Sequence, residues 1–346
     1  MKISPDIISK LHEIDCESLA KTLGLSVKGH RASCFMHVDR NPSLSFKGNY
    51  WKCFSCDKGG DAIAFIQERF SLSFSEACVY LCQHYNIPIN TSSNNVRKKA
   101  FITQPNKTFF PAADTVVGFD SEIAQAIIDW TDLEPKGELF LFKQRMLSPE
   151  IVKCLNIKSI SSYKVLQEKL ETSFGKERLI NSKILDEKTG KLTINIPSLI
   201  IPYYDSNYKI VALQTRYLGT SEYVPRFKLL CNSKAKTYNV PVLADIPIGS
   251  KLFIAEGITD CLSLLSLGKN AVAIQSATCI SLKDLEKMSK YELYMIPDRD
   301  IAGDKAFVKL YRYFLRCEKI LKRIDLPDEY KDFSEYYLAL KKDENK

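Results

Sequence analysis

Helical and strand-like patterns of hydrophobic positions alternate over the N-terminal quarter of the chain. Apolar residues three or four positions apart predict a helical segment over residues 7–24, which ends at a glycine. Residues 43–53 then alternate around a short polar turn, as expected of a β-hairpin. Two further helices are predicted, one that begins after the capping residue Asp61 and one over residues 75–85. The pattern therefore predicts a small antiparallel sheet accompanied by helices.

The middle of the chain has a more mixed pattern. Residues 90–108 are polar and have no periodicity, which predicts a linker. Residues 120–131 and 148–180 have the periodicity of helices, and short strands are predicted over 199–202 and 210–213. We expect this region to form a mixed α/β subdomain.

Beyond residue 249, short apolar strands alternate with helices. Strands are predicted over residues 252–255, 271–274 and 291–296, and helices over 259–267, 282–288 and 304–317. That alternation is typical of a doubly wound parallel sheet. We therefore expect an α+β protein of several domains. They are an N-terminal ribbon domain (1–89), a linker (90–108), a basic α/β subdomain (109–249) and an α/β domain with a parallel sheet (250–346).

Composition agrees with several cores and with no membrane partner. The 346 residues are enough for two or three domains, and 45% of them are hydrophobic. Neither a long apolar run nor an apolar leader is present. The eleven cysteines are an odd number, and several lie within apolar stretches, where a reduced thiol behaves as a small hydrophobe. A reducing, cytoplasmic location is expected rather than a disulfide scaffold.

A C-x2-H-x15-C-x2-C run supplies the first candidate site. Its members are Cys34, His37, Cys53 and Cys56. Two paired turns can present three thiolates and one imidazole at tetrahedral angles, as a zinc ion requires. Four ligands leave no open position, so we expect one structural Zn²⁺ and an N-terminal domain of the zinc-ribbon type. The alternative is that the cysteines are only core thiols.

Aromatic and basic residues alternate around this run. They are Phe46, Tyr50, Trp51 and Phe54, with Arg40, Lys47 and Lys52 between or near them. Aromatic rings beside cations can stack on the bases and hold the phosphates of a single strand. The same rings can instead form the core of a small ribbon, and the sequence leaves both interpretations open.

Positive charge is concentrated in the middle of the chain. The formal net charge is +8, and six basic residues between positions 209 and 236 face the single acid Glu222. They are Lys209, Arg216, Arg226, Lys228, Lys234 and Lys236. Such a run suits a track for a polyanion, although a solvated basic face has the same composition.

Carboxylates follow two of the predicted parallel strands. Glu256 and a glycine come after the first strand, and the pair Asp298 and Asp300 comes after the third. The carboxyl ends of parallel strands meet at one edge, which is where ligands bind in such sheets. Clustered carboxylates there would hold Mg²⁺ or Mn²⁺ for phosphoryl chemistry, whereas each motif alone is more often a surface turn.

The cysteine run and its surroundings resemble the CHC2 zinc ribbon of bacterial and phage DNA primases. The similar segments are 31–37, 42–46 and 51–65, which include the Gly-Gly-Asp-Ala entry to a helix. The acidic segments resemble the TOPRIM domain of DnaG-type primases, topoisomerases and some nucleases. That resemblance implies catalytic roles for Glu256, Asp298 and Asp300. It also suggests Asp332 as a further metal ligand, in competition with Asp325, Asp328 and Glu335.

Residues 144–148 and 200–216 are similar to the basic half of the primase polymerase domain. The resemblance implies that Arg216 faces template and nucleotide, and that Arg226 and Lys228 lie before the nucleotide groove. The glycines that flank the arginine in the family are Thr215 and Tyr217 here, which leaves the shape of the groove open.

Together these resemblances imply a DNA primase that makes short RNA primers on single-stranded DNA from ribonucleoside triphosphates. The alternatives are a TOPRIM nuclease or strand-passage factor, and a non-catalytic replication-initiation protein that binds DNA through its ribbon. No Gly-x4-Gly-Lys-Ser/Thr run is present. We therefore expect that a helicase, where needed, is encoded separately, as in a plasmid, phage or conjugative element.

Overall fold

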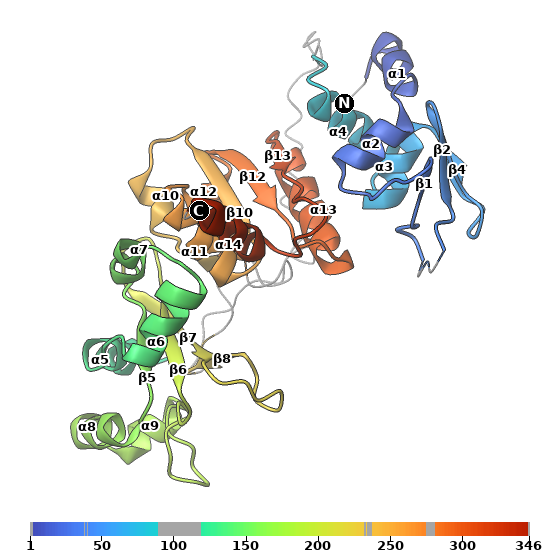
Figure 1. Ribbon diagram of the computed structural model, residues 1–346. Coiled ribbons are helices and arrows are strands. Elements are labelled where there is room, and N and C mark those ends of the chain that lie inside the picture. Colours follow the sequence, from blue (N-terminus) through green and yellow to red (C-terminus); the bar gives the residue numbers. More distant parts are fainter. Residues whose placement is uncertain are drawn as a thin grey trace. The chain divides into compact units, whose positions relative to one another are not determined.

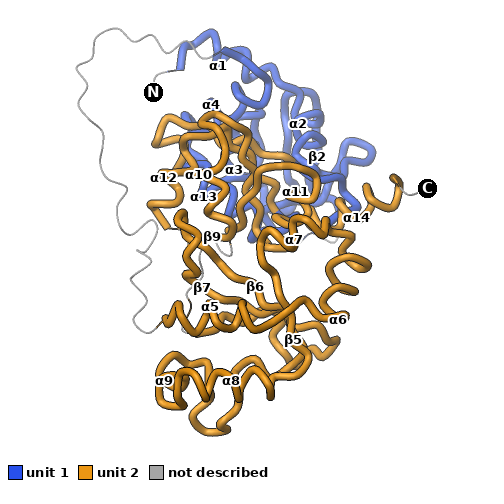
Figure 2. Tube along the Cα trace, turned by 90° about the vertical axis from the view of Figure 1, so that its left-hand side faces the viewer, with its two compact units in different colours: residues 1–103, 298–312, 325–331 blue, residues 104–297, 313–324, 332–346 orange. Residues whose placement is uncertain are grey.

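The chain forms two compact units, which Figure 2 distinguishes by colour. The computed structural model describes residues 3–37, 39, 41–88, 119–231, 233, 237–274 and 281–344. The predicted linker, like Arg40, Lys234 and Lys236, lies outside these residues. Unit 1 comprises residues 1–103, 298–312 and 325–331, and unit 2 comprises residues 104–297, 313–324 and 332–346.

The N-terminal part of unit 1 is a small antiparallel sheet with four helices (Figure 1). Its elements are α1 (Pro5–His12), α2 (Cys16–Thr22), β1 (Arg31–Ala32), β2 (Leu44–Lys47), β3 (Tyr50–Cys53), β4 (Gly59–Gly60), α3 (Ala62–Phe70) and α4 (Phe74–His84). The sheet order is β1-β2-β3-β4, and the predicted hairpin is β2 with β3. The single helical segment predicted at the N-terminus is two helices, because Asp15 accepts a hydrogen bond from the Ser18 amide and begins α2.

The ribbon aromatics divide between core and surface. Trp51 and Phe46 are buried, and the Trp51 ring lies edge-on to Phe65 of α3 with the centroids 5.5 Å apart. Tyr50 and Phe54 are 50% and 69% exposed. Two of the four rings therefore form the core, and two remain accessible to a partner.

The first half of unit 2 is built on a four-stranded antiparallel sheet with the order β5-β6-β7-β8. Its strands are β5 (Lys158–Ile160), β6 (Ser198–Tyr204), β7 (Ile210–Tyr217) and β8 (Phe227–Leu230). Its helices are α5 (Ser121–Asp129), α6 (Pro135–Glu138), the π-helix η1 (Leu139–Gln144), α7 (Pro149–Cys154), α8 (Lys164–Phe174) and α9 (Lys176–Asn181). The continuous helical region predicted over 148–180 is wrong, because β5 interrupts it to pair with β6. Three residues are too few for a strand periodicity to appear in the sequence.

The C-terminal region contains the predicted parallel sheet. Its elements are β9 (Thr237–Tyr238), α10 (Val242–Asp245), β10 (Lys251–Ala255), α11 (Ile258–Ser266), β11 (Ala271–Ile274), α12 (Leu282–Met288), β12 (Glu292–Ile296), α13 (Ile301–Arg316), β13 (Leu321–Arg323) and α14 (Phe333–Glu344). The order is β13-β12-β10-β11-β9, with only the edge strand β9 antiparallel. Helix α11 packs on β10 and β11, and α14 packs on α11 (Figure 1).

Membrane-spanning helices and disulfides were both unexpected from the sequence. No helix in the described part of the chain is long and apolar enough to cross a membrane. Every cysteine that the structure describes is a free thiol. The mixed α/β architecture with an antiparallel ribbon and a mostly parallel sheet is the one predicted.

Candidate functional site

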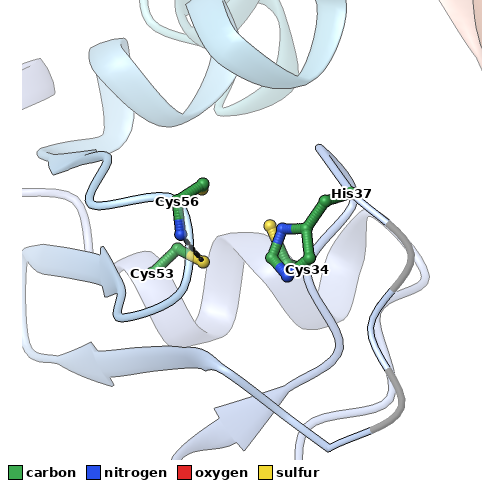
Figure 3. Close-up of side chains that lie close together, drawn as sticks. All are labelled: Cys34, His37, Cys53 and Cys56. Atoms are coloured by element: carbon green, nitrogen blue, oxygen red, sulfur yellow. Dashed lines mark hydrogen bonds between the residues drawn. The ribbon is translucent and has the colours of Figure 1, made fainter.

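The four predicted metal ligands converge on one point of the ribbon. Cys34 and His37 lie in the loop after β1, whereas Cys53 ends β3 and Cys56 lies in the turn that follows. One ligand atom from each lies within 4.8 Å of all the others, and Figure 3 shows the four side chains on two facing turns. The buried Nδ1 atom of His37 has no hydrogen-bond partner among the described residues. Three sulfur atoms and an uncommitted imidazole nitrogen fit a tetrahedral metal ion.

The thiols of this cluster are electrostatically unequal. Burial raises the pKa of Cys34, and the neighbouring Cys53 raises it further. Burial also opposes ionisation of Cys53, but the polar contact of its sulfur with the Ser43 side chain and the hydrogen bond donated by the Cys56 amide outweigh it and lower the pKa of that thiol. A bound cation would favour the thiolate form of all three cysteines.

Asp39 fixes the loop that carries the first two ligands of this cluster. Its Oδ2 atom accepts hydrogen bonds from the Cys34 amide at 2.8 Å and from the Ser43 amide and hydroxyl at 3.0 and 2.7 Å. The side chain of Asp39 is 6% exposed, and these donors lower its pKa to about 2. The carboxylate thus stays charged near neutral pH and ties the first ligand turn to Ser43, the residue before β2.

A second site is a cavity of about 390 Å³ inside unit 2. Its lining residues are Arg145, Gln214, Arg216, Arg226, Phe227, Glu256, Gly257, Ile258, Thr259, Asp260, Asp332 and Ser334. The arginines come from the residue after η1, from β7 and from the β7–β8 hairpin, whereas the carboxylates follow β10, lie in the first turn of α11 and precede α14. The cavity therefore joins a cationic wall to an acidic one.

Arg216 dominates the cationic wall. It is 9% exposed, and its guanidinium carbon lies 3.7 Å from the centroid of the Phe140 ring. Burial lowers its pKa to about 10, with further contributions from Arg145 and Arg226. The guanidinium nevertheless remains charged at neutral pH. Among the described residues its guanidinium donates to the neutral Tyr217 carbonyl at 3.0 Å, which leaves its charge for an anionic ligand.

The acidic wall is linked to the cationic one through α14. The carboxylate of Asp260 accepts a hydrogen bond from the Ser334 amide at 2.7 Å. The Ser334 hydroxyl in turn accepts one from Arg145 at 3.1 Å. A Cβ atom on Gly257 would lie 2.6 Å from the Asp260 carboxylate, so a larger residue there would displace the Asp260 side chain.

The structure gives the predicted residues different surroundings. Four of them line the cavity described above: Glu256, Asp332, Arg216 and Arg226. Lys228 is exposed on β8 and donates to the Thr193 carbonyl at 3.2 Å, outside that lining. Arg145 was indicated only within a similar segment, and Asp260 was not predicted at all.

Asp298 and Asp300 belong to unit 1 and lie in the loop between β12 and α13. β10 and β12 are neighbouring parallel strands with Ala255 opposite Ile296, so Glu256 and this loop both follow carboxyl ends of adjacent strands. Asp300 accepts a hydrogen bond from the Gly303 amide at 2.9 Å and begins α13. Between the two acids, Arg299 donates from its amide to the Lys331 carbonyl at 2.9 Å and from its guanidinium to the Leu326 carbonyl at 3.2 Å.

Two family models match the chain. The CHC2 zinc finger covers residues 8–97, and the Toprim-like domain covers residues 253–337. The DNA primases of Clostridium acetobutylicum and Aquifex aeolicus are each 23% identical to it. These alignments cover 94% and 95% of this chain but 55% and 65% of the relatives, so the chain spans between half and two thirds of their length.

Solved structures share the fold. The zinc-binding and RNA polymerase domains of Aquifex aeolicus primase match with a TM-score of 0.54 and 21% identity, over 99% of this chain and 84% of that one. The RNA polymerase domain of Mycobacterium tuberculosis DnaG, in complex with a double-stranded DNA oligomer that has a 6-nucleotide overhang, matches with a TM-score of 0.52 and 16% identity. That match covers 64% of this chain and 76% of that one.

The fold and the matched models define the class: the chain combines a zinc ribbon with a Toprim domain. More particularly, it has the CHC2 ribbon and the Toprim domain of bacterial DnaG-type DNA primases, to which it is homologous.

Proposed function

We propose that this protein is a DNA primase that joins ribonucleotides on a single-stranded DNA template by metal-dependent nucleotidyl transfer. The observation that supports this most directly is the cavity of unit 2, where arginines face carboxylates. Guanidinium groups bind phosphate oxygens, and carboxylates bind the divalent ions that bridge them. A nucleoside triphosphate with its metal ion offers phosphate oxygens to the arginines and a divalent ion to the carboxylates.

In this proposal Glu256, Asp298 and Asp300 are catalytic carboxylates that hold Mg²⁺ or Mn²⁺, with Asp332 as a further ligand. The metal would neutralise charge on the transferring phosphoryl group. Arg216 would hold nucleotide phosphates inside the cavity, while Arg226 and Lys228 would contact the template or the incoming nucleotide from its rim. Asp260 is a further candidate, because it lines the same cavity beside Glu256.

We also propose that the ribbon binds one structural Zn²⁺ through Cys34, His37, Cys53 and Cys56. Exposed Tyr50 and Phe54 would then be available to stack on template bases beside Lys47 and Lys52. A separately encoded helicase would supply single strands when the template is duplex.

Primer synthesis tests the main proposal. Purified protein, a random single-stranded template and labelled ribonucleotides should yield short RNA products only when Mg²⁺ or Mn²⁺ is added. Degradation of the template without incorporation would instead indicate a nuclease. Template binding without either reaction would indicate a non-catalytic DNA-binding protein.

Loss of the Asp39 carboxylate should weaken zinc binding. Asp39→Asn removes the charge that ties the Cys34 turn to Ser43, and losses of supporting hydrogen bonds of this kind typically cost 10- to 100-fold in metal affinity. The measurement is competition between the protein and a chromogenic chelator. Asp57→Asn is the matched control, because Asp57 follows the ligand Cys56 but its side chain is 91% exposed. Equal zinc affinities for the two variants would contradict this role of Asp39.

Removing phosphate contacts should lower the salt dependence of DNA binding. Arg226→Ala and Lys228→Ala should each reduce the log–log slope against salt concentration by about 0.7 for a single strand, because fewer counterions are released. Fluorescence anisotropy with an oligothymidylate measures the slope. The control is Arg178→Ala, since Arg178 already pairs with Asp120 and Glu122. A double variant of Arg226 and Lys228 with an unchanged slope would refute the contacts.

A further inference from the structure

The Phe140 ring contacts two of the arginines that line the cavity. The guanidinium carbon of Arg216 lies 3.7 Å from the ring centroid, and that of Arg145 lies 5.4 Å from it. Phe140 itself is 8% exposed. The ring is therefore a buried surface beneath both cations and is not itself part of the cavity lining.

The π-helix explains how Phe140 and Arg145 come together. η1 ends with the Arg145 amide donating to the Phe140 carbonyl at 2.9 Å, five residues earlier in the chain. A π-helical turn is wider than an α-helical one and is frequent at functional sites. It brings residues five apart along the chain together, which the three- and four-residue spacing of an α-helix does not do.

Two nearby cations in a partly buried wall repel each other unless something offsets their charge. The face of an aromatic ring is electron-rich and attracts a guanidinium, more strongly where water is excluded. The ring also fixes the plane of Arg216, which has one acceptor among the described residues, the Tyr217 carbonyl at 3.0 Å. The remaining N–H donors along the edge of that plane are left for a ligand.

We propose that Phe140 is a positioning residue that holds Arg216 and Arg145 side by side in the cavity wall so that both bind the phosphates of one polyphosphate ligand. The inference rests on the proposed function, since it takes the cavity to be the nucleotide site. It adds that affinity depends on a planar guanidinium on an aromatic ring and not on positive charge alone.

The test measures binding of inorganic tripolyphosphate by calorimetry and does not depend on primer synthesis. Phe140→Leu should weaken this binding about tenfold, while Phe140→Tyr and Phe140→Trp should remain within about twofold of wild type. Arg216→Lys, which keeps the charge but not the planar group, should lose about as much as Phe140→Leu. Phe174→Leu is the control, because that ring lies 5.0 Å from Arg178 in the same unit but outside the cavity lining.

A double-mutant cycle separates positioning from general loss of structure. If Phe140 acts through Arg216, Phe140→Leu should have little further effect in an Arg216→Ala background. Additive effects, full affinity in Phe140→Leu, or failure of the aromatic variants to restore binding would each overturn the proposal. Should Phe140→Leu not fold, wild-type affinity in Arg216→Lys would overturn it equally. If the effects of Phe140→Leu and Arg216→Ala on tripolyphosphate binding are coupled but the protein makes no primers, the role of Phe140 is supported and only the proposed function is refuted.

Discussion

Replacing Cys53 by serine should release the metal and unfold the ribbon. A structural zinc site contributes on the order of 10 kcal/mol to local folding, and the sheet around this one has edge strands of only two residues. We expect zinc content to fall from about one per chain to none. Amide hydrogen exchange should become fast over residues 31–60, while residues 121–231 keep their protection.

Cys78→Ala is the matched control for this substitution. Cys78 is a buried thiol of α4 in the same unit and is not among the clustered ligands, so the variant should keep its zinc. Wild-type protein that contains no zinc, or Cys53→Ser protein with normal exchange in the ribbon, would refute the structural role.

Glu256→Gln, Asp298→Asn and Asp300→Asn should each reduce primer synthesis by at least about 100-fold, an effect of several kcal/mol on the transition state. The amides keep the shape of the side chains but not the negative charge that holds a divalent ion. Thermal melting should change little. The measurement is incorporation of labelled ribonucleotides at saturating Mg²⁺ or Mn²⁺.

Glu187→Gln controls for the loss of one negative charge, because Glu187 is exposed in a loop away from the cavity lining. Near-normal incorporation by all three carboxylate variants would show that the catalytic assignment is wrong. Loss of incorporation in Asp298→Asn and Asp300→Asn but not in Glu256→Gln would show that catalysis depends on the loop after β12 and not on Glu256 in the cavity of unit 2.

Local spacing made the metal cluster predictable, whereas the cavity needed the tertiary fold. Cys34 and His37 precede one hairpin and Cys53 and Cys56 lie at its end, so their pairing follows from short-range geometry. The strands before Glu256 and Asp298 were predictable because each is a buried apolar run.

The contribution of Phe140 could not be predicted in the same way. η1 lacks the usual helical periodicity. The Phe140 ring meets Arg216 only because β7, which carries Arg216, lies across from η1. The place of Asp260 in the cavity could not be predicted for a similar reason, because its hydrogen-bond partner Ser334 lies on a helix 74 residues away in sequence.

Strand β9 has a consequence for how the polypeptide can be divided. Tyr238 pairs with Ala273 on β11, and its ring lies 5.1 Å from that of Tyr203 on β6. A fragment that begins at residue 250 would lack this strand and leave the outer edge of β11 without hydrogen-bond partners. Exposed edges of that kind recruit other chains and promote aggregation. β9 belongs to the mostly parallel sheet and packs against β6 of the antiparallel sheet. The two parts of unit 2 that carry these sheets are therefore poor candidates for separate expression or exchange between proteins.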